Sequence, residues 1–163
     1  MGRLRMLLVA GVGAVSLVGA GAIGVSAHEG RTLVEFDSMT PVTGAAVGAV
    51  NERGIKGGGL PWAIRSGSGA VSKNGEVKVT VRGLVIPVAP FNGTNPVAKF
   101  GATVSCLTEQ GVVNVSTGLF PANSEGNSTI NGRVALPKHC KDPVVFVVSP
   151  GGAWFSMSNP DKD

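Results

Sequence analysis

The side chains with the clearest capacity for chemistry in this sequence are its two histidines, His28 and His139. Residues 25–27 are small and match the pattern that a signal peptidase reads, so cleavage after Ala27 would make His28 the first residue of the mature chain. An N-terminal histidine offers its α-amine and its imidazole to Cu(II), and the imidazole of His139 would supply a third nitrogen. The sequence therefore offers a copper site, built from His28 and His139, as one hypothesis.

The two tryptophans, Trp62 and Trp154, offer a second hypothesis. Flat aromatic rings on an exposed sheet face stack on sugars, whereas aromatic rings in a core supply packing area. A carbohydrate-binding platform at Trp62 and Trp154 and two core tryptophans are both compatible with the sequence. Glu35 and Asp37, two positions apart, would share a strand face and could bind a cation, or could simply end a strand in solvent.

Residue types and motifs that support common enzyme chemistries are missing from the chain. Tyrosine is absent, and the sequence contains no Gly-x-Ser-x-Gly elbow, phosphate-binding loop or zinc-protease motif. We therefore predict no catalytic residues, no resident metal and no cofactor other than the copper of the first hypothesis. An isomerase or lyase with its pocket inside a barrel remains the alternative enzyme class.

Residues 1–27 have the features of a signal peptide. Arg3 and Arg5 precede an apolar stretch from residue 6 to 25, which is followed by the small residues of the cleavage site. The alternative is an uncleaved anchor, because about 20 apolar residues suffice to cross a bilayer. Removing two of the 14 basic residues leaves 12 against 10 acidic ones, so the net charge falls from +4 to +2. The remaining basic residues are scattered, which argues against nucleic-acid binding.

The only two cysteines, Cys106 and Cys140, permit one pairing. Export places them in an oxidising compartment, where a disulfide forms and persists. Closing a loop of about 35 residues would stabilise the fold by roughly 3 to 4 kcal/mol on the chain-entropy model. The alternative is a pair of buried thiols.

Alternating apolar and polar residues predict strands along most of the mature chain. Val77, Val79 and Val81 alternate with polar residues after an Asn-Gly turn, and residues 97–107 bury one face and expose Thr103 and Ser105 on the other. Further strands are expected at residues 32–36, 61–65, 69–72, 84–88, 112–117, 130–136, 143–149 and 153–157. No convincing amphipathic helix interrupts them. We predict an all-β fold, an antiparallel β-sandwich with immunoglobulin-like architecture and one disulfide, with a small β-barrel as the alternative.

The predicted organisation is a signal peptide at 1–27, an extended, loop-rich part at 28–60, a β-strand core at 61–157 and a flexible tail at 158–163. Several short motifs across residues 33–157 resemble a group of small exported bacterial proteins of uncharacterised activity: Gly-Gly-x-Pro-Trp, Val-x-Gly-Leu-Val-Ile, Asn95-Pro96-Val97-Ala98, Val104-Ser105-Cys106-Leu107, Val113-Asn114-Val115-Ser116-Thr117 and Val147-x-Ser149-Pro150-Gly151-Gly152. The resemblance implies export and a β-rich domain, and it brings no site residues with it.

These observations together predict a secreted, non-enzymatic β domain with a binding or structural role at the cell exterior. The expected partner is a cell-envelope component or an extracellular glycan, with no nucleic acid. The expected contact with the membrane is limited to the signal peptide before cleavage. The ligand itself is not indicated by the residues.

Overall fold

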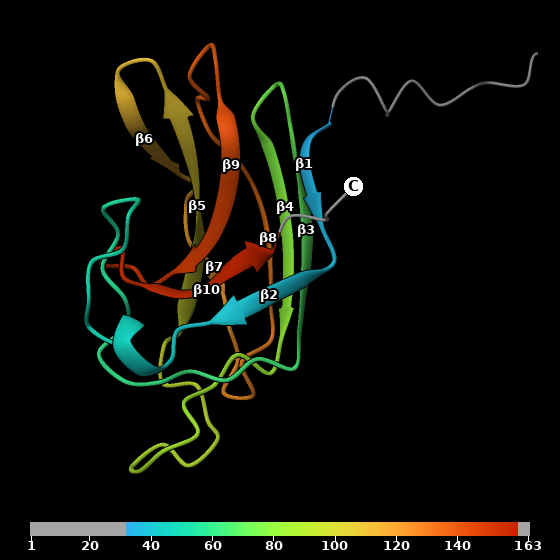
Figure 1. Ribbon diagram of the computed structural model, residues 1–163. Helices are drawn as coiled ribbons and strands as arrows, with labels where there is room; N and C mark the ends of the chain where they lie inside the picture. Colours follow the sequence, from blue (N-terminus) through green and yellow to red (C-terminus); the bar gives the residue numbers. More distant parts are fainter. Residues whose placement is uncertain (1–31, 160–163) are drawn as a thin grey trace, which may run out of the picture.

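A computed structural model describes residues 32–159 and consists of two antiparallel sheets packed face to face (Figure 1). The predicted all-β sandwich is confirmed, and the alternative of a closed barrel is not what the structure shows. His28 and the rest of the predicted signal peptide lie outside the described residues. Within the described part of the chain, no helix is long and apolar enough to cross a membrane.

The smaller sheet has four strands, in the order β1 (Thr32–Phe36), β3 (Ser66–Ser72), β4 (Glu76–Arg82) and β8 (Ser128–Arg133). The larger sheet follows the order β2 (Ser38–Pro41), β10 (Trp154–Asn159), β9 (Lys141–Val148), β5 (Lys99–Thr108) and β6 (Gly111–Ser116), with β7 (Phe120–Pro121) paired to the start of β5. A 3-10 turn, η1 (Gly44–Ala46), follows β2.

The core lies between the sheets and is built from the alternation visible in the sequence. Val77, Val79 and Val81 of β4 are at most 1% exposed, and Phe100 and Val104 of β5 are completely buried. Burying one such side chain stabilises the fold by roughly 1.5 to 3 kcal/mol. The interior between the sheets is therefore filled with apolar side chains.

The prediction that β5 exposes one face is wrong. Thr103 is 5% exposed and Ser105 is completely buried, although both lie on the face opposite the core residues of β5. A segment that we call the strap, residues 42–59, covers this face of the larger sheet. Main-chain hydrogen bonds join Gly58 N–H to the Trp154 carbonyl and Trp154 N–H to the Lys56 carbonyl, both at 2.9 Å. Figure 1 shows the strap beside the start of β10.

Two predicted strands are reduced to isolated pairings. Ala63 and Val85 exchange main-chain hydrogen bonds of 2.8 and 3.0 Å, and Ile86 pairs with Thr94, but residues 61–65 and 84–88 form no continuous ladder with the sheets. Gly83 has a φ of +63°, a value that turns the chain away from the line of β4. The two segments therefore close one end of the sandwich as loops.

The last strand, β10, extends through Asn159, two residues beyond the predicted end of the β core. Its register pairs Asn159 with Ser38 of β2. The hydroxyl of Ser158, which is 2% exposed, accepts a hydrogen bond of 3.0 Å from the Val145 N–H. Residues 158 and 159 therefore belong to the sheet and not to the predicted tail.

Candidate functional site

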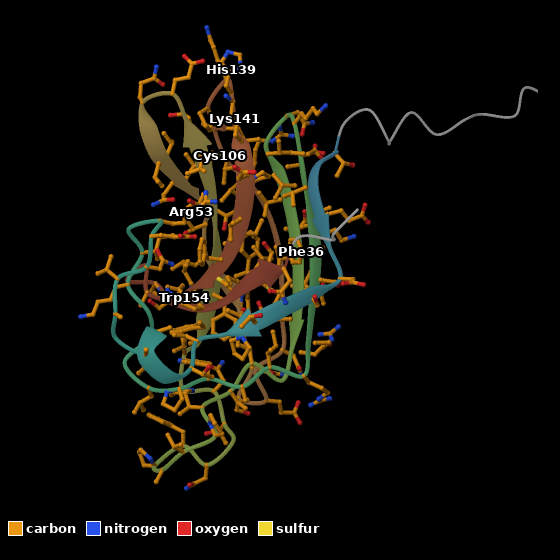
Figure 2. The ribbon with its side chains drawn as sticks, viewed as in Figure 1. Phe36, Arg53, Cys106, His139, Lys141 and Trp154 are labelled. Carbon is orange, nitrogen blue, oxygen red and sulfur yellow. A yellow bond between two sulfur atoms is a disulfide. The ribbon has the colours of Figure 1, made fainter. Side chains whose placement is uncertain are left out.

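The predicted disulfide between Cys106 and Cys140 is present. It joins β5 to the segment immediately before β9, which is the neighbour of β5 in the larger sheet. In antibody domains the equivalent bond crosses between the two sheets, so the position here is different. Cys106 is completely buried and Cys140 is half-buried, so the disulfide runs from the core to the surface of the domain. In Figure 2, Cys106, His139 and Lys141 lie toward the same end of the sandwich.

An open hollow of about 340 Å³ lies beside the disulfide. Its half-buried lining is apolar, and its exposed lining is basic or carries an imidazole. The half-buried residues are Leu33, Leu136, Pro137 and Cys140, and the exposed ones are Lys73, Lys138, His139 and Lys141. No aspartate or glutamate of the described chain lines this hollow. We call it the basic hollow.

Several features hold the walls of the basic hollow in place. Gly75, with a φ of +87°, lies so close to Val134 that a side chain at position 75 would collide with the Val134 carbonyl. The Val134 N–H donates to the Gly75 carbonyl at 2.9 Å, which joins the β3–β4 turn to the connection after β8. The disulfide holds Cys140, and the sheet register places Lys141 opposite Leu107 of β5. The lining is therefore supported by the strands as well as by the connection between β8 and β9.

A second hollow, of about 280 Å³, lies on the other side of the segment Pro137–His139. Thr108, Glu109 and Gln110 line its far wall. Glu109 is the acidic residue of the described chain that lines this second hollow. The basic character is thus concentrated on the side that faces Lys73 and Lys141.

The strap is fixed by Arg53, which is only 9% exposed. Its Nη2 donates to the Asp142 carbonyl at 3.0 Å, and its own carbonyl accepts a hydrogen bond of 2.8 Å from Asn114 Nδ2. Asn114 belongs to β6 and Asp142 to β9, the two strands on either side of β5. Arg53 therefore bridges β5 close to Ser105, the residue paired with Asn114. Figure 2 shows Arg53 on the strap side of the larger sheet.

Three buried polar atoms have no hydrogen-bond partner among the described residues: Arg53 Nη1, Ser105 Oγ and Trp154 Nε1. Arg53 also has no carboxylate within ion-pair distance in the described chain, where the ion pair found is Arg133–Glu76 at 2.8 Å, between exposed side chains. A ligand could reach these atoms only if the strap moved, because each atom is fully covered. Arg53 therefore acts here as an anchor of the strap.

The structure places His139 on the exposed edge of the basic hollow, while His28 lies outside the described residues. Within residues 32–159, no group of three or more His, Cys, Asp or Glu side chains is positioned to hold a metal ion. Glu35 and Asp37 are both exposed and line a shallow hollow that also contains Lys78. A lysine in the same hollow lowers its attraction for a cation.

The structure places both tryptophans in the core. Trp62 is 3% and Trp154 is 4% exposed. The Trp62 ring stacks on Phe155 with a centroid distance of 3.9 Å, and Trp154 packs edge-on against Phe146 at 5.8 Å. A sugar-binding platform needs a ring face that is open to solvent, and neither tryptophan has one here.

Sequence reasoning did not single out the lysines of the basic hollow or the buried arginine of the strap. The segment Lys138-His139-Cys140-Lys141 carried a usable signal, because three basic or imidazole side chains flank a disulfide cysteine within four positions. Lys73 joins them only through the fold. Arg53 gave no signal, since the strap has neither a helical nor a strand period.

Comparison of the chain with protein-family models, with curated proteins and with solved structures found no match.

Proposed function

We propose that this chain is an exported, non-enzymatic binding domain that works at the cell exterior or in association with the cell envelope. The single observation that supports this most is the Cys106–Cys140 disulfide, which persists in oxidising compartments and which borders an open, basic, partly apolar hollow. Residues 1–27 begin with basic residues and end in small residues typical of a signal-peptidase cleavage site, which agrees with export by a cleaved signal peptide.

A binding role agrees with the distribution of the ionisable side chains. The basic hollow collects three of the ten lysines and arginines that the described residues contain, and no acid lines it. Binding sites of soluble proteins combine apolar walls with a few polar groups that orient the ligand. The basic hollow has this composition.

Export and binding can be tested in two steps on the full chain. We expect the product recovered outside the cytoplasm to begin at His28 by mass spectrometry and to contain no titratable thiol. Fluorescently labelled product should then bind to washed envelopes of the producing cells in a saturable manner, and unlabelled product should compete. Retention of the intact chain in the cytoplasm, or binding that never saturates, would contradict the proposal.

We also propose a second candidate, a copper protein that uses His28 and His139, because one observation favours it. Leu33 lines the same hollow as His139, and five residues of chain reach at most roughly 17 Å. The α-amine and imidazole of His28 could therefore reach the neighbourhood of His139. Cu(II) titration followed by electron paramagnetic resonance should reveal nitrogen ligation that is altered by His139→Ala and abolished by one extra residue before His28. Unchanged spectra in both variants would eliminate this candidate.

A further inference from the structure

We infer that the basic hollow binds an amphiphilic organic anion, a molecule with an apolar body and one phosphate or carboxylate head group. This inference rests on the proposed binding function and specifies the chemical class of its ligand. Two independent properties of the hollow support it, namely the chemistry of its half-buried lining and the charge of its exposed lining.

The half-buried lining selects for an apolar body. Leu33 comes from β1, and Leu136 and Pro137 come from the connection between β8 and β9, so two distant segments of chain contribute apolar surface to one wall. Cys140, one half of the disulfide, also lines the hollow. Apolar area removed from water contributes roughly 25 cal/mol per Å², and a hydrocarbon chain laid on these residues would gain this contribution. A small inorganic ion would gain nothing from this part of the hollow.

The exposed lining selects for an anionic head group. Lys73, Lys138 and Lys141 reach the hollow from the β3–β4 turn, the β8–β9 connection and β9, respectively. Lysine ammonium groups bind phosphate and carboxylate as point charges on flexible stems, so three of them can converge on one head group. No carboxylate of the described chain lines this hollow, and the nearest acidic lining is Glu109 in the second hollow, which Lys138 and His139 also border. A cationic amphiphile would be repelled at the same place.

The support beneath this lining distinguishes it from scattered surface lysines. The Gly75–Val134 contact holds the Lys73 turn against the Leu136 segment, and the disulfide fixes the position of Cys140 between His139 and Lys141. Pre-organised walls lower the entropic cost of binding. The hollow is therefore formed before the ligand arrives.

The test titrates the purified chain, with its disulfide intact, with decyl phosphate below its micelle concentration. Inorganic phosphate and decyltrimethylammonium are titrated in parallel. Calorimetry should show saturable binding of decyl phosphate, at least roughly tenfold weaker binding of inorganic phosphate, and no saturable binding of the cationic amphiphile. The NMR methyl signals of Leu33 and Leu136 should shift with decyl phosphate. Decanoate should also bind saturably, which would identify an anionic head group on an apolar chain, and not phosphate itself, as the determinant.

The triple substitution Lys73→Gln, Lys138→Gln and Lys141→Gln should weaken decyl phosphate binding roughly tenfold or more, because each exposed charge pair contributes a fraction of a kcal/mol. The matched control changes the same number of exposed lysines elsewhere, by Lys56→Gln, Lys78→Gln and Lys99→Gln, and should leave the affinity unchanged. Equal weakening in both variants, equal binding of decyltrimethylammonium, or equal affinity for inorganic phosphate would overturn the inference. Saturable envelope binding with no binding of decyl phosphate would overturn this inference and leave the proposed function standing.

Discussion

Arg53 in the strap donates a hydrogen bond of 3.0 Å to the main-chain carbonyl of Asp142, although the two residues are 89 positions apart. The bond connects the strap to the start of β9, the strand that pairs with β5. Because Asn114 donates to the Arg53 carbonyl from the opposite side, one residue fastens the strap across three strands. The strap is therefore part of the folded structure and not an appendage.

Arg53→Ala should lower the free energy of unfolding by about 1.5 to 3 kcal/mol, the usual contribution of a hydrogen bond made by a charged group. Arg53→Met should cost less, because methionine keeps the apolar stem and removes a guanidinium whose Nη1 has no partner among the described residues. Chemical denaturation measures both changes. An equal loss of stability in the two variants would contradict this prediction, because it would mean that the apolar stem of Arg53 contributes nothing and that the guanidinium group accounts for the whole loss.

Replacing both cysteines, by Cys106→Ala and Cys140→Ala, should lower the free energy of unfolding by about 3 to 4 kcal/mol. The estimate follows from the sequence separation of 34 residues on the chain-entropy model. Urea denaturation of the double variant and of the reduced wild-type chain should give similar values. A double variant as stable as the oxidised chain would show that the disulfide is not a structural requirement.

Gly75→Ala should destabilise the fold more than Gly152→Ala. Both glycines have a φ of +87°, but a side chain at position 75 would collide with the Val134 carbonyl, whereas nothing lies within 4 Å at position 152. Gly152→Ala should therefore cost roughly 1 kcal/mol for backbone strain alone, and Gly75→Ala should cost at least 1 kcal/mol more. Thermal unfolding of the matched pair measures the difference. Equal midpoints would exclude a close Gly75–Val134 contact.

The intrinsic tryptophan fluorescence of the folded chain should resist quenching by acrylamide. Trp62 and Trp154 are both buried, and a quencher in solvent reaches them only through local opening. The quenching constant should rise several-fold when the chain is unfolded in guanidinium. Strong quenching of the folded chain would contradict the buried positions and would restore the hypothesis of a sugar-binding platform.

The regular part of the fold could be predicted from the sequence because its signals are local. The alternation of Val77, Val79 and Val81 correctly predicts β4, and the Asn74-Gly75 turn correctly predicts the hairpin of β3 and β4. The two cysteines allowed only one pairing, which the structure confirms. These signals need no knowledge of distant segments.

The rest of the fold depended on contacts that no local pattern records. Thr103 and Ser105 are polar and are therefore predicted to be exposed, yet both are buried. Arg53 of the strap bridges the strands on either side of Ser105, and the Thr103 hydroxyl bonds to the Ser116 hydroxyl at 2.8 Å. The strap itself has no period, since its position is fixed by single hydrogen bonds from Arg53, Gly58 and Trp154 and not by a repeating face. The apolar residues of 84–88 predict a strand, because the hydrophobic pattern contains no sign of the turn that Gly83 introduces with its positive φ.

The basic hollow shows the same limit. His139 was identified as a candidate ligand, whereas the lysines around it were dismissed as scattered surface charges. Lys73 and Lys138 are 65 positions apart, and only the β3–β4 hairpin and its contact with Val134 bring them to one opening. The fold brings these lysines together from separate segments of the chain, so their positions in the sequence do not reveal that they cluster in space.

The pairing of β2 with β10 determines when the larger sheet can be completed. The hydrogen-bonded neighbour of β2 is the last strand of the described chain, with Ser38 opposite Asn159. A chain that emerges from its N-terminus, whether from a ribosome or from an export channel, presents β2 long before that neighbour is available. The strand β2 must therefore remain without this neighbour until β10 has been made, and loss of β10 (Trp154–Asn159) would leave the edge of β2 permanently open to pairing with another molecule.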